Sequence, residues 1–209
     1  MHDFGILISS DLKWYQHVCS ISAKASTRSF QILHCFNSHN VWILLKAYFT
    51  YVRPILEYNT VVWSPYLKKD IYMIESVQKR FTKKICYRCK IPNTSYAHRL
   101  HLLNIKSLEY RRLEFDLVFL YKIINGIVNV KFTDFFTFCH TSYYLRRHKF
   151  HIASLRRPKS EQLNNFFPCR ASRVWNKLPN NIVSAATLSV FKNRLKFFDL
   201  NSIAHLVYS

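Results

Sequence analysis

The chain has 209 residues, about half of them apolar (49 %), so it can bury a substantial core and is not a disordered tail. Its 31 lysines and arginines against 11 aspartates and glutamates give a formal net charge of +20. This surplus favours a polyanionic partner over a solvated surface without one, with nucleic acid ahead of an anionic membrane surface. Only two glycines are present, too few for many hairpins or a glycine-rich phosphate loop, so a mostly helical chain is expected.

No basic region followed by a long apolar run opens the sequence, and Lys46 and Arg53 interrupt the one candidate membrane span. We therefore expect neither secretion nor membrane insertion. Six cysteines without a secretory leader indicate reduced thiols rather than a disulfide framework.

The first predicted element is a strand, because residues 4–14 begin with a short continuous apolar run, Phe4 to Ile8. Such a run suits a buried strand whose partner strands would come from a segment upstream. Residues 20–36 follow as an amphipathic helix, and Ser38 to Asn40 are typical of a helix-capping break.

The longest apolar pattern covers residues 42–58 and predicts a helix that is apolar around most of its girth, in the middle of the core. Pro54 is expected to kink or end its first half. After Ser64 and Pro65, a second helix is expected to pack on the first. Its apolar side repeats at Ile71, Ile74, Val77, Phe81 and Ile85. Its cations, which would face water or a polyanion, are Lys68, Lys69, Lys79, Arg80, Lys83 and Lys84.

The clearest predicted helix covers residues 107–126, with Ser107 as its cap and Asn125-Gly126 as its end. Shorter helices are expected at 96–103, 166–179 and 187–198, and a short helix or turn at 132–138. Residues 140–159 lack a helical period and carry many cations, which predicts either an extended basic arm or a small hairpin. Trp63 and Trp175 are expected to be core anchors.

Five blocks of the sequence, in order, resemble the C-terminal part of LINE-type, jockey-like non-LTR retrotransposon reverse transcriptases. They are FGILISSDLKW (4–14), YVRPILEYNTVVWSPY (51–66), IESVQKRFTKKI (74–85), LHLLNIKSLEYRRLEFDLVFLYKIING (100–126) and FFPCRASRVWNKLPNNIVSAATLSVFKNRLK (166–196). The resemblance implies a mostly α-helical, thumb-like bundle with one short N-terminal strand and a small irregular or β-hairpin basic segment. It divides the chain into a remnant of the last palm strand (1–14), a thumb-like domain (15–138) and a basic arm with a helical extension (139–209).

The family's catalytic carboxylates have no counterpart in this sequence. In the resembled enzymes an aromatic-x-Asp-Asp motif and an earlier Asp hold two Mg²⁺ ions for phosphoryl transfer. Here the closest acidic residues are Glu114 and Asp116, which point roughly 200° apart on a helix and could not share a metal. No catalytic residue and no cofactor are therefore expected in this chain, and the carboxylates would lie upstream of Met1.

Cys86, Cys89, His98 and His101 have C-x₂-C and H-x₂-H spacing and are a weaker candidate for a zinc site, since tetrahedral binding needs all four to converge. Incidental thiols and surface histidines are the favoured alternative. No Ser-His-Asp or Cys-His spacing supports nucleophilic catalysis.

Basic patches with interleaved aromatic residues are the predicted binding sites for nucleic acid. Cations neutralise phosphates, and aromatic faces stack on bases. The candidates are Lys79, Arg80, Lys83, Lys84, Arg88 and Lys90 on one helix, and Arg146, Arg147, Lys149, Arg156 and Arg157 in the basic segment. Contacts to phosphates would be independent of base sequence.

The expected function is thus that of a reverse-transcriptase fragment without the catalytic aspartates, which grips a template–primer duplex or the target nucleic acid, RNA or DNA, by its backbone. A missing palm and fingers segment would be its partner. The alternatives are a non-enzymatic nucleic-acid-binding module and a non-functional transposon remnant. A nuclear location is favoured by the resemblance over a cytoplasmic one.

Overall fold

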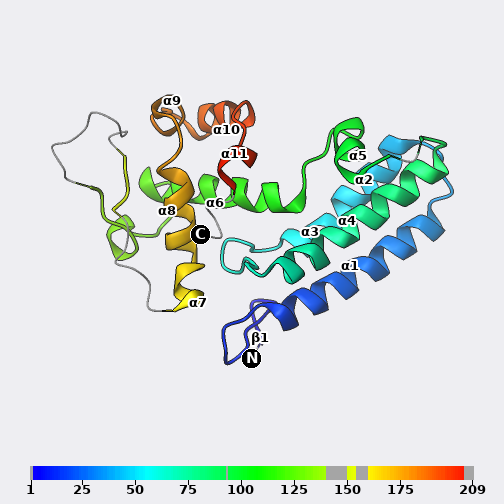
Figure 1. Ribbon diagram of the computed structural model, residues 1–209, viewed down its shortest axis with the longest axis horizontal. Coiled ribbons are helices and arrows are strands. Elements are labelled where there is room, and N and C mark those ends of the chain that lie inside the picture. The colour runs from blue at the N-terminus through cyan, green and yellow to red at the C-terminus, as the bar shows by residue number, and fades with distance from the viewer. Residues whose placement is uncertain (1, 93, 140–149, 154–159, 205–209) are drawn as a thin grey trace. The chain divides into compact units, whose positions relative to one another are not determined.

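The computed structural model describes residues 2–92, 94–139, 150–153 and 160–204, which are mostly α-helical, as expected (Figure 1). The chain divides into two compact units. Unit 1 contains residues 1–60 and 65–111, and unit 2 contains residues 61–64 and 112–209. The expected division at residues 14 and 138 follows the resemblance and stays a prediction. Among the described helices, none combines the length and the apolar character needed to cross a membrane.

Unit 1 opens with the short strand that the sequence predicts. Strand β2 (Ile6–Leu7) pairs antiparallel with β1 (His2–Asp3), and Ile6 is buried. Phe4 and Gly5 turn the chain with positive φ values of 42° and 80°, a conformation that glycine adopts without strain. The tight turn thus gives β2 a local partner, and the expectation of further strands from a segment upstream stays a prediction.

Helix α1 (Tyr15–Cys35) buries Val18, Ile21 and Ala25. The predicted central helix is two helices, α2 (Val41–Tyr51) and α3 (Arg53–Glu57). Asn40 caps α2 by accepting hydrogen bonds from the amides of Trp42 and Ile43 at 2.9 and 3.3 Å. The break falls at Val52, and Pro54 lies in the first turn of α3, which confirms the predicted interruption.

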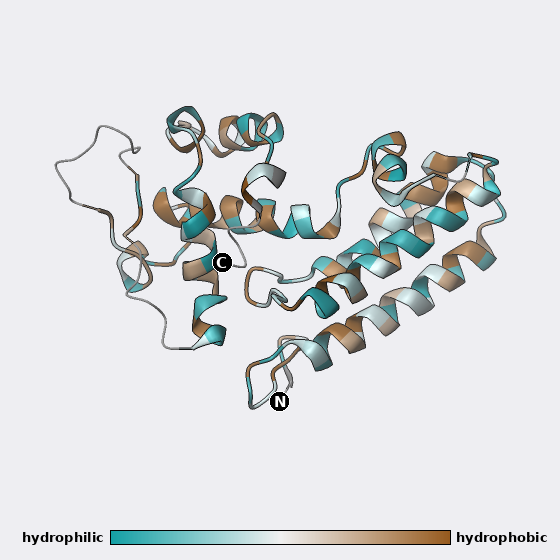
Figure 2. Cartoon of the chain, in the orientation of Figure 1, coloured by the Kyte–Doolittle hydropathy of each residue, from teal (hydrophilic) through white to brown (hydrophobic). Residues whose placement is uncertain are grey.

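The core of unit 1 forms where α4 (Lys68–Arg88) packs against α1 and α2 (Figure 2). Ile74, Val77, Phe81 and Ile85 of α4 are almost completely buried, and the Phe81 ring stacks on Tyr48 with centroids 4.8 Å apart. Trp42 and Tyr51 of α2 are 66 % and 53 % exposed, so the expected burial around most of that helix was wrong at both of its ends. Helix α5 (Tyr96–Leu102) follows, capped by the Ser95 hydroxyl.

Unit 2 is built on α6 (Leu108–Ile124), whose first turn belongs to unit 1. The later elements are η1 (Phe132–Asp134), α7 (Glu161–Asn164), α8 (Phe167–Trp175), α9 (Asn180–Val183), α10 (Leu188–Lys196) and α11 (Asn201–Ala204). Trp63 and Trp175 are fully buried, which confirms both as core anchors.

A buried ion pair lies in the interior of unit 2. Arg170 donates from Nε and Nη2 to the two carboxylate oxygens of Asp116, at 2.8 and 3.0 Å. Its Nη2 also donates to the Val61 carbonyl at 2.7 Å, so the pair ties residues 61–64 to this unit. Both side chains are at most 4 % exposed. Burial raises the pKa of Asp116, and the Arg170 guanidinium acts in the opposite direction.

Residues 151 and 152, inside the predicted basic segment, pair with the residues just before that segment. Phe138 and Ile152 form an antiparallel bridge, and the Cys139 amide donates to the His151 carbonyl at 2.9 Å. Residues 140–149 and 154–159 lie outside the described residues.

Candidate nucleic-acid interface

A hollow of about 660 Å³ opens on the surface of unit 1 between α4 and α5, and we call it the basic groove. One wall comes from α4, with Tyr72, Ser76, Lys79, Arg80 and Lys83. The other wall comes from α5 and the residues before it, with Thr94, Ser95, Tyr96 and Arg99. The volume lies in the range of pockets that hold a small molecule or one unit of a polymer.

The α4 wall follows from helical spacing. Tyr72, Ser76, Lys79 and Lys83 are separated by steps of four, three and four residues, so they share one face. The Nζ of Lys79 lies 5.8 Å from the centroid of the Tyr72 ring and 5.9 Å from that of Tyr96, within reach of a cation–π contact with each. Lys79 therefore stands between two aromatic rings on opposite walls.

A buried polar network fixes the Tyr96 ring. The Tyr96 hydroxyl donates to Glu75 and accepts from the Nε2 of Gln78 at 2.9 Å. The Tyr48 hydroxyl in turn donates to Gln78 Oε1 at 2.9 Å. Burial, and after it the Glu75 carboxylate, raises the pKa of Tyr96, so its phenol stays protonated and keeps donating. This wall of the groove is held in place before any ligand arrives.

The wall opposite α4 holds two polar groups without hydrogen-bond partners, one on Thr94 and one on Arg99. We call these two residues the inner wall. Arg99 is only 4 % exposed; its Nη1 donates to the Thr94 carbonyl at 2.5 Å, and its Nη2 to that of Lys79 at 3.5 Å. Within the described residues, its Nε and the Thr94 hydroxyl are buried and bond to nothing. Buried donors are rarely left unpaired, because each costs about 1–3 kcal/mol.

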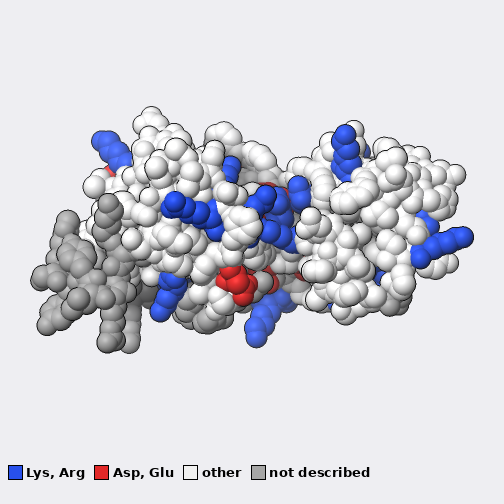
Figure 3. Space-filling view, turned by 90° about the horizontal axis from the view of Figure 1, so that it is seen from above, with Lys and Arg blue, Asp and Glu red and all other residues white. Residues whose placement is uncertain are grey.

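Figure 3 shows lysines and arginines in several separate places on the face that it presents. The predicted cations fall into groups. Lys79, Arg80 and Lys83 line the groove and are exposed. Arg80 is partly held, since its Nη2 donates to the Ser26 hydroxyl at 3.2 Å. Lys84 is exposed beside a smaller hollow of about 220 Å³, which Phe30 and Leu33 also line.

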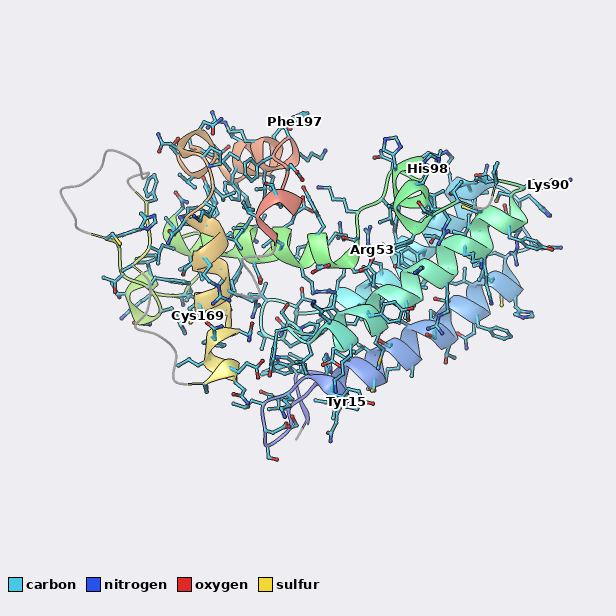
Figure 4. All side chains as sticks on the ribbon, in the orientation of Figure 1. Tyr15, Arg53, Lys90, His98, Cys169 and Phe197 are labelled. Carbon is cyan, nitrogen blue, oxygen red and sulfur yellow. The ribbon has the colours of Figure 1, made fainter. Side chains whose placement is uncertain are left out.

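Two further cations lie toward the end of α4. Arg88 donates to the carbonyls of Leu33 and Phe36 at 2.5 and 2.7 Å, so it caps the C-terminus of α1. Lys90, just beyond α4, is exposed and projects outward (Figure 4). The predicted cations Arg146, Arg147, Lys149, Arg156 and Arg157 lie outside the described residues.

The four candidate zinc ligands are not brought together. Cys86 is buried and Cys89 half-buried, and burial raises the pKa of both thiols. His98 and His101 are exposed, and His98 projects outward from α5 (Figure 4). Across the described ranges, no three His, Cys, Asp or Glu side chains form a group that could hold a metal ion.

The described acidic residues also do not fit the paired magnesium ions of the resembled enzymes. Both oxygens of Asp116 are taken by Arg170, and Glu114, two residues away on the same helix, forms no metal-binding group with it in the described part of the chain. Two adjacent Mg²⁺ ions need clustered carboxylates with available oxygens.

Comparison with known proteins finds a relative in Caenorhabditis elegans. An uncharacterized protein of Caenorhabditis elegans is 32 % identical over 126 residues, which cover 60 % of this chain and 64 % of the relative. The chain thus spans less than two thirds of that relative's length. No protein-family model and no solved structure matches the chain.

Sequence reasoning missed part of the groove. Tyr72 could have been found, since it lies seven residues before Lys79 and shares its helical face. Thr94, Tyr96 and Arg99 gave no such signal, because the fold of the α4–α5 connection brings them opposite α4.

Proposed function

We propose that this chain binds RNA or DNA through backbone phosphates at the basic groove of unit 1, as part of an RNA-directed DNA polymerase of the LINE type that its sequence resembles. The observation that carries the proposal is the exposure of Lys79, Arg80 and Lys83 around one hollow. None of the three forms an ion pair with an acidic residue of the described chain, so their charge is available to phosphate. The five sequence blocks supply the link to the polymerase.

Binding of this kind neutralises phosphates and releases their counterions, so it depends on salt and not on base sequence. The proposed role is to hold nucleic acid while carboxylates outside this chain hold the metal ions and carry out nucleotide addition. A nuclear location follows from the same resemblance. The groove is built from residues of unit 1 alone, which also supports the alternative of a binding module that acts without polymerisation.

The test is a binding titration of the full chain with a labelled oligonucleotide over a range of salt concentrations. The variant Lys79→Ala/Arg80→Ala/Lys83→Ala removes three charges from the groove. The matched control, Lys192→Ala/Arg194→Ala/Lys196→Ala, removes the same residue types from α10, where they are also exposed. Each triplet includes an arginine with one hydrogen bond to a group outside its own helix, from Arg80 to Ser26 and from Arg194 to the Asn181 carbonyl.

The groove variant is expected to lower the slope of log K against log salt by about 2 to 3, since each phosphate contact contributes about 0.7 to 0.9. The control should retain most of the slope. Equal losses in both variants would show a diffuse charge effect and overturn the proposal. A slope near zero for the unmodified chain would instead favour a non-functional remnant.

A further inference from the structure

The basic groove has features that a row of phosphate-binding cations does not need. A duplex backbone is contacted by cations on an open surface, whereas this groove is hollow and has a tyrosine ring on each wall. Tyr72 is 65 % exposed, and its ring faces no stacking partner among the described residues. Tyr96 is half-buried and held by Glu75 and Gln78. The two rings therefore differ: Tyr96 is fixed and Tyr72 is available.

Proteins that bind single-stranded nucleic acid combine exposed aromatic faces with nearby cations, and the basic groove has both. Unpaired bases stack on aromatic side chains, and cations beside the rings follow the backbone. Bases within a duplex are already stacked on one another and are not free to stack on a tyrosine ring. The Nζ of Lys79, close to both rings, is placed to meet a phosphate next to a stacked base.

A phosphate bound at the inner wall would satisfy its two unpaired polar groups. The Nε of Arg99 and the hydroxyl of Thr94 are buried without partners in the described structure, and both residues line the groove. Thr94 lies in the short connection before α5 and lines the hollow. A phosphate oxygen accepts from a guanidinium and a hydroxyl at once, and Lys79 and Lys83 balance its charge.

We propose that the basic groove holds one unstacked nucleotide of a single strand, with its base on Tyr72 and its phosphate on the inner wall formed by Thr94 and Arg99. This inference rests on the proposed function and adds that the preferred ligand is single-stranded rather than duplex. It does not choose between DNA and RNA, because both share the base face and the phosphate.

The experiment measures the affinity of the full chain for oligothymidine of about 12 nucleotides, long enough to cover one site, and for a mixed-sequence duplex of the same length. The single strand is expected to bind more tightly. Tyr72→Leu should weaken single-strand binding about 5- to 150-fold, the range for loss of one base–aromatic stack. Tyr72→Phe, which keeps the ring face, should retain the affinity.

The matched control is Tyr87→Leu. Tyr87 lies on the same helix, is 88 % exposed and does not line the groove, so its loss should leave single-strand binding unchanged. Both tyrosines are on the surface, so neither variant threatens the fold.

Thr94→Val tests the inner wall. The change keeps the shape of the side chain and removes only the hydroxyl. We expect about 10- to 150-fold weaker single-strand binding, the effect of one hydrogen bond to a charged group. Thermal stability should not fall, because the hydroxyl has no partner in the described structure.

The two proposals fail in different ways. Tighter binding of the duplex, or equal effects of Tyr72→Leu on both ligands, would overturn the single-strand inference, while a large effect of the Lys79/Arg80/Lys83 variant would leave the proposed function standing. If that triple variant changes the binding of neither ligand, the proposed function falls as well.

Discussion

The basic groove of unit 1 and the interior of unit 2 use their cations in opposite ways. In unit 1, Lys79 and Lys83 extend into an open groove, and no carboxylate of the described chain pairs with them. In unit 2, Arg170 is buried against Asp116, and the half-buried Arg173 donates to the Asn164 side chain at 2.7 Å. A donor that is paired within the chain supports the fold, whereas a donor without a partner remains available to a ligand.

The same contrast recurs within unit 1. Arg88 satisfies carbonyls at the end of α1, and Arg99, in the wall of the groove, is buried and donates to two carbonyls. A planar guanidinium with several donors suits such interior positions better than the compact ammonium of lysine. The net charge of +20 therefore overstates the charge available to a polyanion, and the lysines locate the binding surface better than the arginines do.

The largest effect is expected in unit 2. Arg170→Ala should lower the free energy of unfolding by about 3–5 kcal/mol, because it leaves the buried Asp116 carboxylate without its partner. Urea denaturation followed by circular dichroism measures the loss, with the exposed Lys192→Ala as the control. A loss as small as that of the control would contradict the contrast between the units.

A smaller loss of stability is expected from a change in the hydrogen-bond network of Tyr48, Gln78 and Tyr96. Tyr48→Phe removes the hydroxyl that donates to Gln78 and leaves a buried acceptor unpaired, at a cost of about 1–3 kcal/mol. Tyr51→Phe, on the same helix but 53 % exposed, is the control and should be nearly neutral. Because Gln78 also holds Tyr96, weaker single-strand binding by Tyr48→Phe would sharpen the link between the core and the groove.

The smallest expected effect is a pH-dependent change in stability that comes from Asp70. Asp70 is buried at the start of α4, and burial raises the pKa of its carboxyl. The folded chain thus binds this proton more tightly than the unfolded chain, so the stabilisation is present at low pH and is lost as pH rises through the folded pKa.

Asp70→Asn should therefore be more stable than the unmodified chain at neutral pH, with an advantage that shrinks as pH falls toward the ordinary value of 3.8. We expect less than about 1 kcal/mol, because the N-terminus of α4 favours the carboxylate. Thermal melts at several pH values, with the exposed Asp134→Asn as the control, would detect it. An advantage that grows toward acid pH would have the wrong sign.

Most helices could be predicted because apolar periodicity and capping residues are local signals. Pro54 marked the break between α2 and α3, and Asn125-Gly126 marked the end of α6. The exposure of Trp42 could not be predicted, since periodicity does not tell how much of a helix its neighbours cover. For the candidate site, the lysines of α4 came from spacing, whereas Arg99 and the engagement of Arg88 with α1 depend on contacts between elements distant in sequence.

The four tryptophans differ in their exposure between the two units, so the intrinsic fluorescence of the chain can report on the unfolding of each unit. Trp63 and Trp175 are fully shielded from water in unit 2, whereas Trp42 is largely hydrated and Trp14 partly so in unit 1. Indole emission shifts to longer wavelength in water, so opening of unit 2 would move the fluorescence maximum strongly and opening of unit 1 only slightly. Comparing that shift with helix content during unfolding would show, without any added label, whether the units open together or in succession.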